Sequence, residues 1–377
     1  MFRSRLTPFA LSILTLALAG APSTAETVTE QSEIGPIQIE TVTSGLESPW
    51  AMAFLPDGRF LVTERGGAMR IVNGDTVGAP LSGLPDIADR GQGGLLDVAL
   101  APDFATSNMI LFSYSEPALR GIGTAVSKAT LTESGLANVE RIFSMNNKSF
   151  GGRHFGSRLA FAPDGTLFIT TGDRGEPNRS QDGSDHAGSV IRINLDGSAP
   201  ADNPSFSVPA TPVTWSIGHR NPQSAAINPT TGVLWTVEHG ARGGDEVNIP
   251  QAGLNYGWPI ISYGREYSGG KIGIGTEAPG YEQPIHYWDP SIAPSGMAFG
   301  TNLSVPEWQS SLFVGALRGA HISRLSLDGD RIVGEEQILE SLGERIRDVR
   351  IGPDGALYAL TDSPEGRILR ITPDRQS

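Results

Sequence analysis

The sequence predicts an all-β protein and, within that class, a six-bladed β-propeller. Three observations support this prediction. An apolar segment, a tight turn of the Pro-Asp-Gly type and a second apolar segment recur six times along the chain. Glycine (47 residues) and proline (27 residues) are abundant, which favours short strands and turns over long helices. The 377 residues also exceed the size at which one core usually stops growing, near 250–300 residues, so a domain built from repeats is expected.

The six copies follow one plan. The clearest begin at Ala51 (AMAFLPDGRFLVTE), Arg158 (RLAFAPDGTLFITT) and Asp348 (DVRIGPDGALYALT), and degenerate copies begin at Asp97, Ser224 and Gly296. Each alternates apolar and polar positions across a tight turn, which indicates an antiparallel hairpin. Such sheets arranged around an axis form a propeller, and a pair of β-sandwiches would not account for six copies of one turn.

Two further segments are expected to close the ring and to form a loop over one face. Residues 37–43 are expected to add a strand that closes the ring against the last copy. Residues 178–207, rich in Gly, Asp, Ser and Pro, are expected to be an irregular insertion, and residues 175–188 to form a loop over one face of the propeller.

The first 25 residues have the pattern of a secretory signal peptide. Arg3 and Arg5 precede an apolar run over residues 9–19, and small residues end at Ala25. That run is shorter than the roughly 20 residues that span a bilayer, so no membrane span is expected after cleavage. We therefore expect a single propeller domain over residues 26–377 in a periplasmic or secreted protein. The chain has no cysteine, so a disulfide framework is excluded.

The chain is acidic, with a formal net charge of −13. This charge disfavours nucleic acid as a partner, whereas divalent cations suit an acidic exported protein. No P-loop, dinucleotide-binding fingerprint, serine nucleophile elbow or paired-histidine zinc motif is present, which disfavours NAD-dependent and serine-hydrolase chemistry.

Polar and glycine residues are concentrated between Gly218 and Pro259 (GHRNPQ…EHGARGGDEVNIPQAGLNYGWP). Arg220 and Asn221 suit a carboxylate and a neutral polar group, and Glu246 and Tyr256 can give oxygens to a cation. Gln92, Arg318 and Arg347 lie at strand edges of other copies.

We expect a propeller to bring these positions around one mouth. Arg220, Arg318 and Arg347 would then face one cavity and hold a small polyanion, most simply a tricarboxylate. A structural salt bridge is the alternative for each arginine taken singly, and Asp348 or Glu344 is the expected partner of Arg347.

His154 is the best candidate for a general base. An ordinary imidazole titrates near pH 6.5 and can take a proton from an alcohol at neutral pH. It lies among glycines in GGRHFGS, just ahead of a predicted strand, while the other five histidines are scattered. The alternative is a structural histidine.

At these residues the chain resembles the pyrroloquinoline quinone (PQQ)-dependent soluble sugar dehydrogenases, in the aldose sugar dehydrogenase branch of the glucose/sorbosone dehydrogenase family. The motifs GQGGLLDVALAPDF, GGRHFGSRLAFAPDG, GHRNPQ and EHGARGGDEVNIPQAGLNYGWP occur in the order and at the spacing of that family. The resemblance extends over nearly all of the chain after residue 25. It implies a six-bladed propeller with PQQ in its mouth, as the repeats predict independently.

The resemblance also implies roles for individual residues. His154 would take the proton of the anomeric hydroxyl while hydride passes to PQQ, so an aldose becomes a lactone and an external acceptor receives the electrons. Cofactor contacts are implied for Gln92, Arg220, Asn221, Tyr267, Arg318 and Arg347, and Ca²⁺ ligands for Glu246 and Tyr256, the latter through its carbonyl. Arg318 stands where relatives often have lysine.

Two other functions fit the sequence. A calcium-dependent propeller lactonase or hydrolase is the first, although such enzymes gather acids around the metal and this chain offers arginines. A propeller that binds a protein or glycan without catalysis is the second. The preferred sugar depends on loops near residues 178–207 and 264–281, which have no readable code, and the protein is expected to be a monomer or a homodimer.

Overall fold

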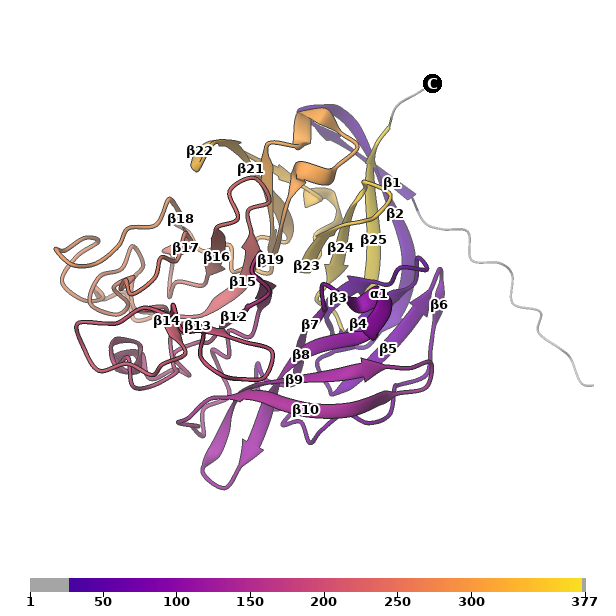
Figure 1. Cartoon of the computed structure of the whole chain (residues 1–377). Coiled ribbons are helices and arrows are strands. Elements are labelled where there is room, and N and C mark those ends of the chain that lie inside the picture. Colours follow the sequence, from indigo (N-terminus) through magenta and orange to yellow (C-terminus); the bar gives the residue numbers. More distant parts are fainter. Residues whose placement is uncertain (1–26, 375–377) are drawn as a thin grey trace, which may run out of the picture.

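Six antiparallel sheets arranged as the blades of a β-propeller make up the computed structural model, which describes residues 27–374 (Figure 1). The predicted fold class is therefore confirmed. The predicted signal peptide, residues 1–25, lies outside the described residues. No helix within residues 27–374 is both long and apolar enough to cross a membrane.

The first two blades contain β3 (Pro49–Phe54), β4 (Phe60–Glu64), β5 (Ala68–Asn73) and β6 (Thr76–Val77), then β7 (Leu95–Leu100), β8 (Met109–Ala118), β9 (Gly121–Leu131) and β10 (Leu136–Ser144). The third and fourth contain β11 (Leu159–Phe161), β12 (Leu167–Thr170), β13 (Ser189–Ile193) and β14 (Thr214–Ile217), then β15 (Pro222–Ile227), β16 (Leu234–Glu238), β17 (Asp245–Asn248) and β18 (His286–Trp288).

The fifth blade contains β19 (Pro294–Phe299), β20 (Ser311–Ala316), β21 (His321–Asp328) and β22 (Arg331–Ile338). The sixth contains β23 (Ile346–Ile351), β24 (Leu357–Thr361) and β25 (Gly366–Pro373), joined by β2 (Gly35–Leu46) and β1 (Thr27–Ser32). The helical segments are α1 (Phe104–Ser107), η1 (Pro177–Gln181), η2 (Gly300–Asn302), η3 (Pro306–Trp308) and η4 (Glu340–Leu342).

Each predicted copy forms the first two strands of one blade. The predicted insertion at residues 178–207 is wrong in part, because β13 of the third blade lies within it. Its apolar residues at alternate positions pair with β12, which explains why a segment between two polar loops still enters the sheet. The loop expected over residues 175–188 is present and contains η1.

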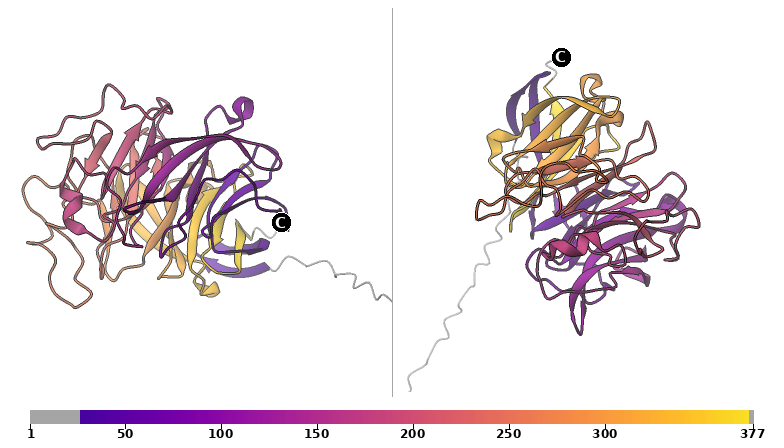
Figure 2. Two further views of the ribbon diagram at one scale, coloured as in Figure 1. Left: turned by 90° about the horizontal axis from the view of Figure 1, so that it is seen from below. Right: turned by 90° about the vertical axis from the view of Figure 1, so that its left-hand side faces the viewer.

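The ring closes through strands from opposite ends of the chain. β2 pairs with β25, with Ile39 opposite Ile371 and Thr43 opposite Ile368, as predicted for residues 37–43. β1 extends the same sheet and was not predicted. Both views of Figure 2 show the indigo N-terminal strands beside the yellow C-terminal ones. The first and last blades are thereby held together without a covalent link.

The apolar core consists of six clusters, each between two neighbouring blades. The first strands lie innermost, and β3, β7, β15, β19 and β23 share one burial pattern: four buried residues, then two partly buried ones. In an antiparallel sheet the start of a first strand lies at the same edge as the end of the second. Residues just before a first strand and just after a second strand therefore meet at one face.

Candidate active site

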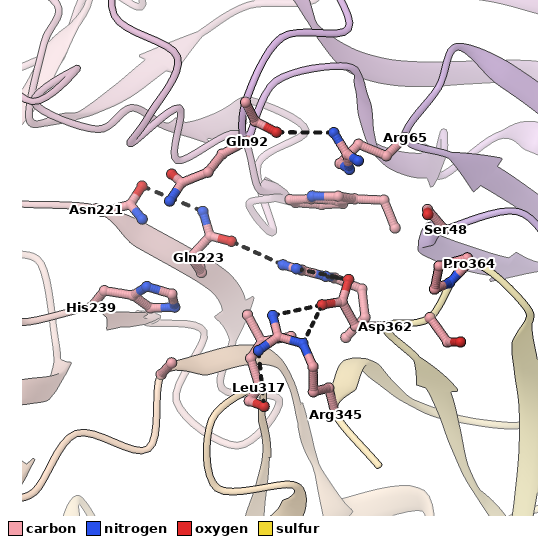
Figure 3. A pocket seen from close by; sticks show the side chains of 15 residues that line it. Ser48, Arg65, Gln92, Asn221, Gln223, His239, Leu317, Arg345, Asp362 and Pro364 are labelled. Carbon is pink, nitrogen blue, oxygen red and sulfur yellow. Dashed lines mark hydrogen bonds and ion pairs between the residues drawn. The ribbon is translucent and has the colours of Figure 1, made fainter.

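A cavity of about 480 Å³ opens at that face (Figure 3). Of the predicted site residues, Gln92, Asn221 and Arg347 line it. The full lining is Ser48, Trp50, Arg65, Gly91, Gln92, Asn221, Gln223, His239, Ala293, Leu317, Arg345, Arg347, Asp362, Ser363 and Pro364. Because these residues come from several blades, the cavity lies on the axis of the ring.

A chain of polar side chains crosses one wall of this cavity (Figure 3). Gln223 donates from Nε2 to Asn221 Oδ1 at 3.4 Å, and Gln223 Oε1 accepts from Arg347 Nη1 at 3.3 Å. Asp362 then joins two guanidinium groups, with Arg347 Nη2 at 3.1 Å and Arg345 Nε at 2.7 Å. Each side chain is thus fixed by its neighbour, and the wall offers amide and guanidinium groups to a ligand.

The acid partner of Arg347 differs from the two that the sequence suggested. Asp348 pairs with Arg158 and Arg350 in the core, and Glu344 pairs with Arg367. Asp362 follows β24, so the turn of the chain brings it back toward the start of β23. Burial alone would raise the pKa of Asp362, but the nearby arginines hold it below its usual value.

His154 forms a short hydrogen bond with a carboxylate that the sequence analysis missed. Its Nδ1 lies 2.6 Å from Asp173 Oδ1, and both side chains are buried. Asp173 also accepts from the Gly175 amide at 2.6 Å and from Trp258 Nε1 at 2.8 Å. The His154 amide donates to Gln92 Oε1 at 2.7 Å, which ties this pair to the cavity lining.

The protonation state of His154 follows from these contacts. Burial lowers the pKa of His154, the Asp173 carboxylate opposes this, and the Arg220 charge lowers it further. The pKa of Asp173 is itself lowered, because its partners outweigh its burial. An ionised Asp173 accepts from Nδ1–H, which leaves the lone pair on Nε2. That atom makes no hydrogen bond to any residue in the described part of the chain, so it is available to a substrate.

Close backbone packing makes the His154–Asp173 contact possible. Gly172 precedes Asp173, and a Cβ at this position would lie 2.3 Å from the carbonyl oxygen of His154. Only glycine allows the two loops to approach this closely. His154 itself has a φ of 54°, an uncommon conformation for a residue with a side chain.

A second imidazole, His239, also lines the cavity. Its Nε2 donates to the Pro294 carbonyl at 2.6 Å, so Nδ1 carries the lone pair. Burial lowers the pKa of His239 to about 3, and the charges of Arg220, His154 and Arg347 act in the same direction. His239 is therefore neutral.

The remaining predicted cofactor residues lie at different places. The Arg220 guanidinium donates to the His239 carbonyl at 3.2 Å and to Gly240, and lies over the Trp258 ring at 5.2 Å. Arg318 lines a second, neighbouring cavity rather than the central one. Tyr267 lies on an outer loop with 70% of its surface exposed. Of the three arginines expected to face one cavity, Arg347 lines the central cavity and Arg318 lines the second, whereas Arg220 lines neither of these two.

The predicted metal ligands lie beside a second buried carboxylate. Asn248 donates to Glu238 Oε1 at 3.0 Å and to Glu246 Oε2 at 3.1 Å. Burial, together with the Glu238 charge, raises the pKa of Glu246 to about 8. The buried Asn248 Oδ1 has no partner among the described residues. The carboxylates and this free amide oxygen form an oxygen-rich group of the kind that binds Ca²⁺.

Tyr256 has a hydroxyl that is already engaged. It donates to the Ile249 carbonyl at 2.6 Å and accepts from the Gln251 amide at 2.9 Å, and its ring stacks on His219. The Tyr256 carbonyl accepts no hydrogen bond from a described residue, so only that oxygen remains available. Within residues 27–374 no three His, Asp or Glu side chains are grouped so as to hold a metal by themselves.

Several site residues that the sequence did not predict share one position in the blades. Arg65, Asp173, His239, Leu317 and Asp362 all lie at or just after the end of a second strand. Aligning the six copies with one another would have marked this position as facing the mouth. The most distinctive sequence motifs instead lie just before the first strands.

Comparison with known proteins agrees with this geometry. Residues 46–370 match the model of the family described as Glucose / Sorbosone dehydrogenase. The chain is 44% identical over 371 residues to Aldose sugar dehydrogenase YliI of Escherichia coli (strain K12), covering 96% of this chain and 97% of the relative.

Two solved structures show the same fold. The apo form of the soluble aldose sugar dehydrogenase from Escherichia coli superposes with a TM-score of 0.87 at 45% identity, covering 89% of this chain and 99% of that one. The PQQ-bound form of aldose sugar dehydrogenase from Streptomyces coelicolor superposes with a TM-score of 0.73 at 28% identity, covering 93% of this chain and 99% of that one.

Proposed function

The chain belongs to the glucose/sorbosone dehydrogenase family, and we propose that it is a PQQ-dependent aldose sugar dehydrogenase that oxidises the C1 hydroxyl of aldoses to lactones. The single observation that most supports this is the His154–Asp173 pair beside a cavity rich in guanidinium groups. An external acceptor would receive the electrons. The proposal includes export to the periplasm or the medium and a monomeric or homodimeric state.

His154 is the general base in this proposal. Asp173 holds Nδ1–H, so the Nε2 lone pair accepts the proton of the C1 hydroxyl. Because burial lowers the pKa of His154, the imidazole is neutral and ready to accept at neutral pH. Once protonated, the imidazolium is stabilised by the buried Asp173 carboxylate. General-base assistance of this kind is typically worth about 10²–10⁴-fold in rate.

The lining of the central cavity fits PQQ, a planar tricarboxylate. Arg65, Arg345 and Arg347 line it together with one carboxylate, Asp362, and Arg65 also pairs with Asp89 outside the lining. Gln92 and Asn221 add neutral polar groups, and the Trp50, Gln223 and His239 side chains complete the wall. When bound, PQQ supplies the acceptor for the C1 hydride. The Arg220 guanidinium donates to the carbonyl of His239, which lines this cavity, and Arg220 is included among the proposed cofactor contacts.

Calcium binding is part of the same proposal. The Glu246 carboxylate and the Tyr256 carbonyl are the proposed ligands, and Glu238 and Asn248 adjoin Glu246. A divalent cation would relieve the repulsion between the Glu238 and Glu246 carboxylates and give the free Asn248 oxygen a partner. Arg318 and Tyr267 stay in the cofactor proposal on the family resemblance, although Arg318 lines the neighbouring cavity and Tyr267 lies on an exposed outer loop.

Reconstitution tests the proposal directly. The purified protein is loaded with PQQ and Ca²⁺, and reduction of a redox dye is followed with a panel of aldoses. Sugar-dependent dye reduction with lactone as product is the expected result. His154→Ala should lower turnover by about 10²–10⁴-fold while PQQ absorbance after gel filtration stays the same. No dye reduction with any aldose would reject the proposal, and release of PQQ from the variant would reassign His154 to cofactor binding.

A further inference from the structure

A buried arginine without an acid partner, Arg174, directly follows Asp173 in the chain. Its residue is 1% exposed, and its guanidinium forms no ion pair with any residue in the range 27–374. Arg158, which is equally buried, has two carboxylate partners. Burial lowers the pKa of Arg174 to about 9, so the group is still charged at neutral pH. Because an unpaired buried charge is costly, a gain in fold stability does not account for this residue.

The guanidinium of Arg174 instead binds the backbone that leads to His154. Its Nη2 donates to the Gly151 carbonyl at 2.6 Å, and its Nη1 donates to the Arg153 carbonyl. Arg153 directly precedes His154 in the chain. Because the guanidinium fork is planar and rigid, its two donors fix both carbonyls of this short segment relative to each other.

The face of the same guanidinium covers the residue that directly follows His154. Arg174 Cζ lies 3.4 Å from the centroid of the Phe155 ring, and Phe155 is buried. A cation over an aromatic face is attracted by the negative charge of that face. Phe155 also packs against the loop that carries Gln92, since a Cβ at Gly93 would lie 2.7 Å from the Phe155 Cζ. Arg174 therefore contacts the chain on both sides of the imidazole.

The segments that Arg174 joins have uncommon backbone conformations. The φ angle is 54° at His154, 91° at Ser157 and 59° at Arg174 itself. Residues with a side chain hold such values only where surrounding contacts impose them, and they gather at functional sites. The two hydrogen bonds and the ring contact of Arg174 are contacts of this kind, because they join residues 151–155 to the segment that carries Asp173.

We propose that Arg174 is a positioning residue that holds the His154 imidazole against Asp173 in the orientation that proton transfer needs. This inference rests on the proposed function, because the orientation affects turnover only if His154 is the base. Lysine cannot take the place of Arg174, since an ammonium group has no planar fork to bridge two carbonyls and cover a ring. Without the arginine, residues 151–155 relax and the imidazole loses its fixed position.

Kinetics of the enzyme loaded with PQQ and Ca²⁺ test the positioning role. Arg174→Lys and Arg174→Met should lower kcat by about tenfold to 10²-fold, because a small misplacement of a reacting group has effects of this size. KM for the aldose should change little. Arg192→Met is the matched control. Arg192 is 5% exposed at the tight-turn end of the same blade, lies over the Trp215 ring and pairs with Asp164 and Asp202, so its loss should lower the melting temperature but not kcat.

Titration of His154 in the PQQ-free protein separates this inference from the proposed function. Nuclear magnetic resonance of ¹⁵N-labelled histidine follows the pKa, and His154→Ala assigns the signal. Burial is the largest influence on the pKa of His154 and outweighs the opposing Asp173 carboxylate. Loosening the segment in Arg174→Lys should therefore raise this pKa toward 6.5, whereas Arg192→Met should leave it unchanged. If wild type oxidises no aldose, this shift alone decides the positioning role.

Two results would overturn the inference while the proposed function stands. The first is an unchanged kcat in both Arg174 variants of an active enzyme, which would leave Arg174 a packing residue. The second is loss of PQQ with normal kcat in the loaded fraction, because Arg174 would then serve the cofactor. Should neither Arg174 variant fold, Phe155→Leu removes the ring under the guanidinium and should also lower kcat and raise the pKa of His154. No change in either quantity would contradict the proposal.

Discussion

At the scale of single residues, the site depends on partners that set protonation states. Asp173 fixes the tautomer of His154, and the Pro294 carbonyl fixes that of His239. Burial keeps both imidazoles neutral at neutral pH, since it lowers both pKa values. His154 differs in having a carboxylate to stabilise its charged form, which a base needs and His239 lacks. This difference explains why only one of the two histidines suits proton transfer.

Asp173→Asn tests this arrangement. An amide that donates to Nδ1 would place the proton on Nε2, so kcat should fall by about 10²–10⁴-fold. The proposed mechanism requires a neutral His154, so kcat/KM should rise with pH through a pKa below 6.5 in the wild type. Because the Asp173 carboxylate raises that pKa, its removal should move this rise to lower pH. A pH–rate profile of the reconstituted enzyme checks both effects, and an unchanged profile would contradict the role of Asp173.

Glu246 gives a second prediction at this scale. Its pKa is raised from 4.5 to about 8 in the folded protein, so folding binds a proton more tightly and stability falls as pH rises from about 4.5 through 8. Without calcium, Glu246→Gln should therefore melt at a higher temperature than wild type at pH 8. Added Ca²⁺ should raise the melting temperature of wild type and of the exposed control Glu307→Gln, but not of Glu246→Gln. An equal calcium response in all three proteins would remove Glu246 from the site.

At the scale of elements, the same hairpin forms the first two strands of every blade, and the loops at one of its ends carry the site residues. The tight turn lies at one end of the first strand, and the functional loops lie at the other. The last blade is the exception, since β2 comes from the N-terminus and supplies Ile37 and Ile39 to the core between the fifth and sixth blades. The stability of the ring therefore depends on an element far in sequence from its partner strand.

Ile39→Ala should measure that dependence. Ile39 is 1% exposed and lies opposite Ile371, so its truncation should cost about 2–5 kcal/mol of unfolding free energy. The neighbouring Gln38 points to the opposite, exposed side, and Gln38→Ala should cost no more than about 1 kcal/mol. Urea unfolding followed by tryptophan fluorescence checks both values. Equal small effects would show that β2 does not secure the ring.

At the scale of the whole molecule, a buried charge network links the blades below the site. Arg158 Nη1 lies 3.1 Å from Asp97 and 3.0 Å from Asp348, which belong to the second and sixth blades. The second contact is an ion pair without hydrogen-bond alignment, since Asp348 Oδ1 has no hydrogen-bond donor. Arg158 also donates to the Gln223 and Arg347 carbonyls and lies over the Trp50 ring at 4.3 Å.

Arg158→Met should therefore affect the whole ring. It leaves two buried carboxylates short of a partner, which should cost about 3–5 kcal/mol of unfolding free energy. The exposed pair of Arg331 and Asp328 provides a control, and Arg331→Met should cost about 0–1 kcal/mol. Thermal unfolding of the two variants measures both losses of unfolding free energy. A loss below about 1 kcal/mol for Arg158→Met would contradict a central role for the network.

The sequence by itself determined the fold of this protein and the family to which it belongs. Six copies of one hairpin can bury their apolar faces only against one another, so the period and number of the copies predict a ring. The motifs around Gln92, His154, Arg220 and Asn221 predicted the face on which the site lies, because each stands just before an inner strand.

Only the tertiary structure decided which side chains act together. Asp173, Asp362 and His239 reach the mouth from loops after second strands, and their partners lie 15 to 85 residues away in sequence. It also separated Arg318 from Arg347 and placed it with Arg242 and Arg265. The physical reason is that a local pattern fixes the direction and spacing of strands, whereas contacts across the axis depend on how all six blades pack around it.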